Sequence, residues 1–135
     1  MLIRKVPLQI KPPSNIVFVV TNEYLDLNAY IIKMGFPYPD HIDKDSVELE
    51  GYVYSDQQGR DYYCVIHRFT SSGYIAHEIR HLLNHVYHDI NYTPDLDNDE
   101  LDCYLLGYFV DYLQKLQLQY AASTAKNTED EDVSA

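Results

Sequence analysis

The sequence holds little of three things: cysteine, positive charge and long apolar runs. Its two cysteines, Cys64 and Cys103, cannot form a disulfide framework, and we expect both as buried, reduced thiols. Only 10 Lys and Arg stand against 21 Asp and Glu, a formal net charge of −11. Such a chain repels nucleic-acid phosphates and anionic membrane surfaces, so neither is an expected partner.

No apolar run reaches the length that spans a bilayer, and Pro12 and Pro13 interrupt the apolar N-terminal stretch. We therefore expect neither a transmembrane segment nor a secretory signal, and a cytoplasmic protein. The 135 residues, 46% of them hydrophobic, suffice for one domain with its own core. We assign residues 1–120 to that domain and the small, polar and acidic residues 121–135 to a disordered tail.

Apolar patterning and turn residues predict an α+β fold with a small antiparallel or mixed sheet. The expected elements are, in order, a strand over 16–20, a helix ending at 34, a hairpin of strands over 47–54 and 62–69, a helix over 73–90 and a helix ending near 120. Thr21 or Asn22 can cap the first helix, and Ser71 or Ser72 the second. Asp97 and Glu100 have the spacing of a capping box that opens the third.

Four of the six histidines fall within twelve residues of the second predicted helix: His77, His81, His85 and His88. At about 100° per residue, the four lie within roughly an 80° arc of one helix face. The first pair belongs to the motif His-Glu-x-x-His at 77–81.

Histidines at i and i+4 lie one turn apart, so both imidazoles can reach one Zn²⁺. Glu78 is rotated off the ligand line, which suits it to take a proton from a zinc-activated water as the general base. The alternative is a polar helix face with solvated histidines. The largely apolar residues around the motif argue against it, because buried histidines without partners are costly.

The motif leaves the third metal ligand open. Metzincins carry glycine and histidine where this chain has Asn84 and Tyr87, so that pattern fails. His85 and His88 lie further along the same helix, and by helical rise they are poorly placed to join His77 and His81. A ligand from the third predicted helix, which opens with Asp99-Glu100, is the better candidate.

The motif and the segment that follows it resemble a group of small phage-encoded proteins classed as zinc metallopeptidases by their motif. After His77-Glu78-x-x-His81, the family pattern continues as acidic residues and then E-x-x-A-Y-L-x-G with an aromatic. This chain matches it at Glu100, Tyr104, Leu105, Gly107 and Tyr108, and has Cys103 in place of the alanine. The resemblance covers roughly residues 62–113.

The resemblance implies a minimal gluzincin-like domain, in which a small sheet packs on the motif helix and a C-terminal helix. It implies a Zn²⁺ site made by His77, His81 and Glu100, with a peptide or protein as substrate and the host cytoplasm as location. It leaves open whether Glu100 serves only as a capping residue. A glycine within a helix is otherwise unfavourable, so we expect the motif helix and the third predicted helix to approach each other closely at Gly107.

Other roles remain open at this point. Candidates for stabilising the oxyanion or supporting the ligands are Tyr104, His85, His88, Tyr92 and Asp99; Asp102 and Asp111 are further candidates for orienting a ligand histidine. Cys103 has a small chance of touching the metal. The strand over 62–69 would pair with an extended substrate if it is a sheet edge.

Three functions are compatible with these residues. The leading hypothesis is a zinc metallopeptidase that hydrolyses a peptide bond with Glu78 as general base. The second is a catalytically weak or inactive zincin-fold protein that serves a phage by binding, or as a structural component. The third is a metal-free acidic interaction protein, which the net charge of −11 suggests but which leaves the histidine helix unexplained. The sequence does not specify an oligomeric state.

Overall fold

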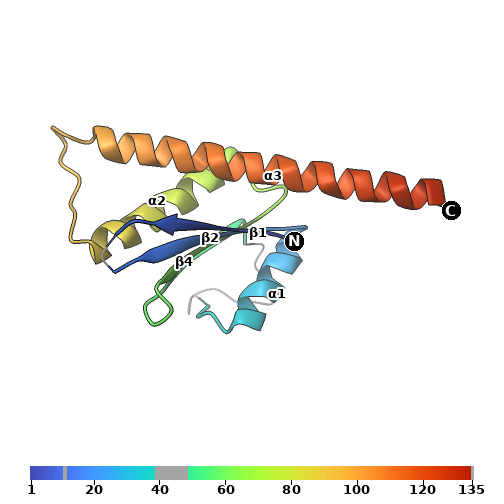
Figure 1. Ribbon diagram of the computed structural model, residues 1–135, viewed down its shortest axis with the longest axis horizontal. Helices are drawn as coiled ribbons and strands as arrows, with labels where there is room; N and C mark the ends of the chain where they lie inside the picture. Colours follow the sequence, from blue (N-terminus) through green and yellow to red (C-terminus); the bar gives the residue numbers. More distant parts are fainter. Residues whose placement is uncertain (11, 39–48, 135) are drawn as a thin grey trace.

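The computed structural model describes residues 1–10, 12–38 and 49–134; for residues 126–134 the description is limited to the backbone. The described part is α+β, with one four-stranded mixed sheet and three helices (Figure 1). The elements are β1 (Leu2–Leu8), β2 (Ser14–Thr21), α1 (Tyr24–Met34), β3 (Gly51–Asp56), β4 (Asp61–His67), α2 (Ser72–Asp89) and α3 (Glu100–Ser134).

The sheet has the strand order β1-β2-β4-β3, so β1 and β3 are its edges and β4 is interior. β1 and β3 run antiparallel to their neighbours, whereas β2 and β4 are parallel, with α1 in the connection between them. The expected hairpin is present as β3 and β4, although residues 47 and 48 of its first strand lie outside the described residues. The strand over 62–69 is therefore not a sheet edge.

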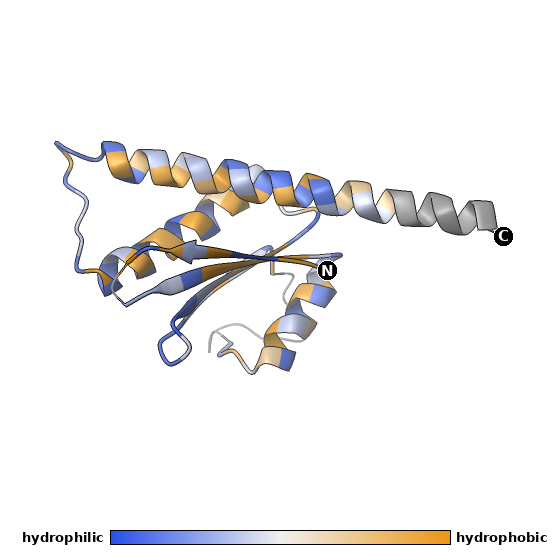
Figure 2. Ribbon diagram, in the orientation of Figure 1, coloured by the Kyte–Doolittle hydropathy of each residue, from blue (hydrophilic) through white to orange (hydrophobic). Residues whose placement is uncertain are grey.

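Alternation along the central strands creates two cores, one on each face of the sheet. Ile16 and Phe18 of β2 join Cys64 of β4 in the core shared with α2 and α3. Val17 of β2 and Val65 of β4 belong instead to the core under α1. Figure 2 shows apolar residues on the sides of α2 and α3 that face the sheet and each other.

The ends of the helices differ in detail from the sequence prediction. α1 is capped by Glu23, which exchanges hydrogen bonds with Asp26 in a capping box, rather than by Thr21 or Asn22. It ends at Gly35, whose φ of 71° is the left-handed conformation that glycine adopts without a steric penalty. α2 follows a cap made by Ser71, whose hydroxyl oxygen accepts a hydrogen bond from the backbone N–H of Tyr74.

The predicted capping box of the last helix is wrong, because α3 begins at Glu100, so that Asp99 and not Asp97 is the residue before its first turn. The helix also continues to Ser134, past the end expected near residue 120. It runs antiparallel along α2 and extends well beyond the rest of the molecule (Figure 1). Within the described residues, no helix is both long and apolar enough to cross a membrane.

Candidate metal and peptide site

The two histidines of the motif meet on an exposed face of α2, and His85 and His88 are exposed as well. The expectation that the apolar residues around the motif bury these histidines is therefore wrong. Their Nε2 atoms are 3.1 Å apart, and their ring centroids lie 4.6 Å apart at 85°. Two nitrogens held at about 2.0–2.1 Å from one tetrahedral zinc would lie roughly 3.3 Å apart. The same distance suits an N–H···N hydrogen bond between the rings. The pair therefore has the spacing of two ligands on a common metal without any change of backbone.

The environment of His81 favours its neutral form. Partial burial lowers the pKa of His81, and the neighbouring His77 and His85 lower it further. Neutral imidazole is the form that coordinates a metal, because protonation occupies the donor nitrogen. Helix geometry thus brings together three of the four clustered histidines in one row, and their mutual repulsion when charged favours the state that binds a cation.

Glu78 lies on a different side of α2, between the helix and the edge strand β3. Its side chain is only 8% exposed, and burial raises the pKa of its carboxyl to about 7. The thiol of Cys64 lies beneath it: burial first, and then the charge of Glu78, raise the pKa of Cys64. Within the described part of the chain, the Glu78 carboxyl has no hydrogen-bond partner.

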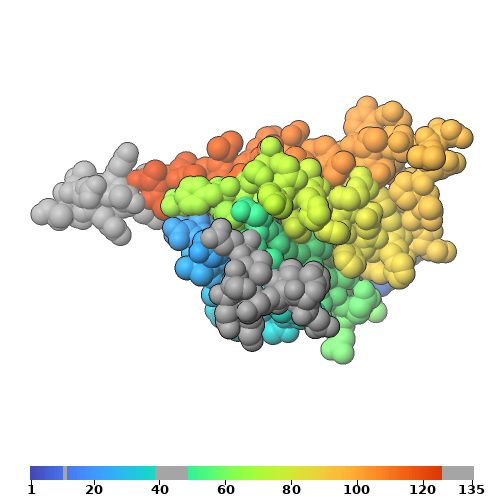
Figure 3. Space-filling model, turned by 180° about the vertical axis from the view of Figure 1, so that it is seen from behind, coloured from blue at the N-terminus to red at the C-terminus, as the bar shows by residue number. Residues whose placement is uncertain are grey.

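β3 passes so close to Glu78 that only glycine fits there. A Cβ on Gly51 would lie 2.5 Å from Cγ of Glu78 and 2.9 Å from its Cδ. Since β3 is an edge strand, the buried carboxyl lies directly beside a strand that pairs on one side only within the described residues. Seen from behind, the exposed side of α2 runs between α3 and the β3–β4 pair (Figure 3).

The predicted third ligand does not join the histidine pair. In the described residues, no group of three His, Cys, Asp or Glu side chains is close enough to hold a metal ion. Asp102 points toward α2, where its Oδ1 accepts hydrogen bonds from Arg80 at 3.0 Å and from the Tyr87 hydroxyl at 2.7 Å. Glu100 lies two residues before Asp102, which corresponds to about 200° of rotation around the helix. Because Asp102 points toward α2, Glu100 faces away from it, and Glu100 is exposed.

Asp102 links α3 to α2 through hydrogen bonds. Burial alone would raise the pKa of its carboxyl, but hydrogen bonds from Arg80 and Tyr87 and the charge of Arg80 outweigh it, so the pKa is lowered. The Asp102 carboxylate is accordingly held by Arg80 and Tyr87, and in this structure it does not orient a ligand histidine. Asp111, the other distant candidate, is exposed on α3.

The remaining candidates are scattered. Nδ1 of His88 lies 3.4 Å from the carboxylate of its neighbour Asp89, and Tyr104 is 73% exposed on α3. Tyr92 packs its ring against Tyr87, with centroids 5.1 Å apart. Two expectations are wrong. Cys103 is exposed rather than buried, and a Cβ on Gly107 would meet nothing within 4 Å, so this glycine marks no close helix approach. Asp99 is half-buried ahead of α3.

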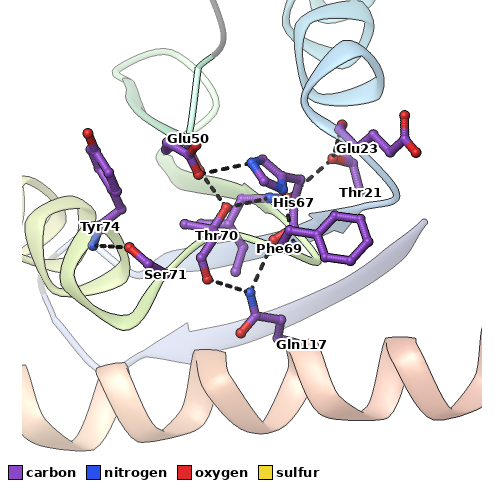
Figure 4. A network of polar contacts seen from close by, with 10 residues as sticks. Thr21, Glu23, Glu50, His67, Phe69, Thr70, Ser71, Tyr74 and Gln117 are labelled. Atoms are coloured by element: carbon purple, nitrogen blue, oxygen red, sulfur yellow. Dashed lines mark hydrogen bonds and ion pairs between the residues drawn. The ribbon is translucent and has the colours of Figure 1, made fainter.

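A polar network that sequence reasoning missed fixes the turn between β4 and α2 (Figure 4). The ring of His67 accepts a hydrogen bond from the backbone N–H of Phe69 at Nδ1, and its Nε2 lies 3.1 Å from the carboxylate of Glu50. The amide of Gln117, on α3, donates to the carbonyls of His67 and Thr70 at 3.2 and 2.8 Å.

Thr70 completes the network. Its hydroxyl donates to the carbonyl of Glu50 at 2.6 Å and accepts from the backbone N–H of His67 at 3.1 Å. The start of the histidine helix is thereby tied to both β3 and α3. These partners are far apart in sequence, so no local pattern signals them. The glycine at 51 is different, because a lone glycine in a strand indicates a close backbone approach.

Comparisons with protein-family models, curated proteins and solved structures found no match to this chain.

Proposed function

We propose that this protein is a zinc-dependent peptidase of minimal, zincin-like design, in which His77 and His81 bind the metal and Glu78 is the general base. The observation that carries the proposal is the histidine pair, with Nε2 atoms 3.1 Å apart, one residue away from a buried carboxyl with a pKa of about 7. General bases work best when their pKa is near the operating pH.

The two histidines fit zinc in donor type and in spacing, and the lowered pKa of His81 favours the neutral donor. A bound zinc ion would supply a Lewis acid that polarises the scissile carbonyl and lowers the pKa of water. Glu78 then takes a proton from the attacking water and delivers it to the leaving amine as the C–N bond breaks. Its buried position keeps its pKa high enough for both transfers.

The edge strand β3 is the proposed binding surface for substrate. An extended peptide can add to a free sheet edge through main-chain hydrogen bonds. β3 supports this role better than the interior strand β4, because β4 is already paired on both sides. Gly51 of β3 lies against Glu78, so a peptide on this edge would run past the general base.

The test has two parts, metal binding and turnover. We expect about one zinc per wild-type chain, measured by elemental analysis of protein purified without a histidine tag or chelators. His77→Ala should abolish this zinc, whereas His88→Ala, an exposed histidine on the same helix, should retain it. Absence of zinc in the wild type, with no uptake at neutral pH, would refute the proposal.

Turnover is measured on a pool of unrelated peptides analysed by mass spectrometry. Glu78→Gln should keep the zinc and lose cleavage by a factor of about 10² or more, the usual size of general-base catalysis. Asp111→Asn, the same kind of change at an exposed position on α3, should cleave as the wild type does. Equal cleavage by Glu78→Gln and wild type contradicts the role of Glu78. Glu100→Gln tests the third ligand separately: loss of zinc affinity assigns it.

A second candidate is a zincin-like protein that binds zinc but serves as a binding or structural component. The orientation of Glu100, exposed and directed away from α2, favours this candidate. It predicts zinc in the wild type, no cleavage of any peptide, and unchanged partner binding by Glu78→Gln. The same variant therefore separates the two candidates.

A further inference from the structure

An apolar cavity of about 250 Å³ lies at the C-terminal end of α2, away from the histidine pair. Its walls come from the sheet, from α2 and from α3, and include Leu8, Ile16, Val86, Ile90, Leu105 and Phe109. Most of these side chains belong to the main core or pack against it. The cavity is therefore held open by well-packed elements, independently of any metal.

The exposed wall of this cavity is apolar, although Tyr87 and Tyr92 are among its lining residues. Tyr87 lines it, but the Tyr87 hydroxyl donates its hydrogen bond to Asp102. A buried water needs two to four polar partners, and apolar cavities of about 150 Å³ stay dry and bind small hydrocarbons. The cavity here is larger and partly open, and its apolar wall gives it the chemistry to take an apolar ligand.

The cavity opens where the end of α2 meets the first turn of α3. Two of its lining residues are also exposed, Ile90 at 38% and Leu101 at 56%. These residues flank the connection between the two helices. The cavity is partly open, so an extended apolar chain has a route into it beside these two residues.

The segment that joins the two exposed lining residues, Ile90 and Leu101, is strongly negative. Residues 89–102 contain six Asp and Glu and no Lys or Arg. Asp102 is paired with Arg80, and Asp89 accepts a hydrogen bond from Tyr62. Within the described residues, the other four have no ion pair: Asp95, Asp97, Asp99 and Glu100. A ligand with an anionic head would be repelled at this entrance, whereas a cationic head would be attracted.

We propose that this cavity binds the alkyl chain of an amphiphile whose head group is positively charged. The chain replaces empty space along apolar walls, and the head stays at the entrance beside Asp97 and Asp99. The inference stands whether or not the protein is a peptidase, because none of the cavity residues belongs to the motif.

The test is a titration of the full-length ¹⁵N-labelled protein with octylamine, octanol and octanoate, each below its aggregation concentration, followed by two-dimensional NMR. Octylamine should shift the amide signals of Ile16, Val86 and Phe109 in a saturable way. Its affinity should exceed that of octanoate by about threefold or more at low salt, with the difference shrinking at high salt. Signals around Leu118, which is exposed on α3 outside the cavity, should not move.

Two blocking variants keep the result decisive. Ile90→Trp covers the entrance from a partly exposed position, and Leu105→Trp fills the cavity itself. Each should reduce octylamine affinity at least tenfold, with an unchanged circular dichroism spectrum. Asp97→Asn combined with Asp99→Asn should reduce the preference for octylamine over octanoate. Unsaturable shifts, equal affinity for octanoate, or unchanged binding by a folded blocking variant would each overturn the proposal.

Discussion

Gly51 is the residue at which the path of β3 and the position of Glu78 constrain each other. A Cβ there would lie 2.5 Å from Cγ of Glu78, a distance that requires one of the two elements to move. Gly51→Ala should lower the free energy of unfolding by about 1–3 kcal/mol, the usual cost of overpacking. Urea denaturation of the single variant and of the double variant Gly51→Ala/Glu78→Ala checks this. The double variant should recover most of the loss, because it removes the clashing Cγ. Equal loss in both would show that Gly51 is required for another reason.

Gly107 provides the opposite case. It lies within α3, and a Cβ there would meet nothing within 4 Å. Alanine is favoured over glycine inside a helix by about 0.5–1 kcal/mol. Gly107→Ala should therefore raise the free energy of unfolding by about this amount, measured in the same urea series. A destabilised variant would instead indicate the close helix contact that the sequence suggested.

The candidate site shows what a sequence conveys at the scale of single residues. The meeting of His77 and His81 could be predicted, because it follows from helical periodicity alone. The burial of Glu78 could not, since it depends on β3 crossing α2. The orientation of Glu100 could not be predicted either. It follows from the rotation of α3 about its axis, in which Asp102 contacts Arg80 and Tyr87.

At the scale of elements, the carboxylate of Asp102 adds a polar link between α2 and α3 to the apolar core that the two helices share. The Tyr87 hydroxyl donates to it at 2.7 Å from a side chain that is only 5% exposed. Removing a hydrogen bond to a charged group costs about 1.5–3 kcal/mol. Tyr87→Phe should thus lower the free energy of unfolding by about this amount. Tyr92→Phe, the same change in the ring that packs against Tyr87, should stay within about 0.5 kcal/mol.

The coupling between Tyr87 and Asp102 is measured with a double-mutant cycle that adds Asp102→Asn. Because the two groups share one hydrogen bond, the two losses should not add, and an interaction energy of about 0.5–3 kcal/mol is expected. Strict additivity would mean that the two side chains stabilise the helix pair independently.

The elements themselves differ in how far local sequence determines them. β2 and α2 follow from patterning, because β2 is a continuous apolar run rich in β-branched residues and α2 has one apolar side and a serine cap. β1 was not predicted, since its residues are mostly exposed and its strand conformation depends on pairing with β2. The start of α3 was misplaced because Asp97 and Glu100 have capping-box spacing although the helix begins only at Glu100.

For the whole molecule, the acidity and the length of α3 are the dominant features. Most of the formal charge of −11 lies in two segments: residues 89–102 hold six acidic residues and no basic one, and residues 126–135 hold four acidic residues against one lysine. Like charges on a compact domain repel one another and reduce its stability, and salt screens this repulsion. The last residues of α3 are therefore expected to contribute charge rather than core contacts.

The extent of the folding unit is tested by two truncations of α3. Up to residue 125, where burial is described, the last buried apolar side chains of α3 are Leu113 and Leu116. Gln117 donates hydrogen bonds to the turn before α2, and Tyr120 packs at the edge of the core. A chain ending at residue 125 keeps all of these contacts and loses acidic charge, so it should unfold at the same temperature as the full chain or slightly above it. A chain ending at residue 112 loses both leucines, each worth about 2–5 kcal/mol when its side chain is removed from a core. Since whole domains are stable by only about 5–15 kcal/mol, the shorter chain should fail to fold cooperatively.

Thermal unfolding followed by circular dichroism at 222 nm distinguishes the two chains, with the helical signal corrected for length. A chain of 125 residues that unfolds far below the full-length protein would show that the end of α3 is part of the folding unit rather than an extension of it.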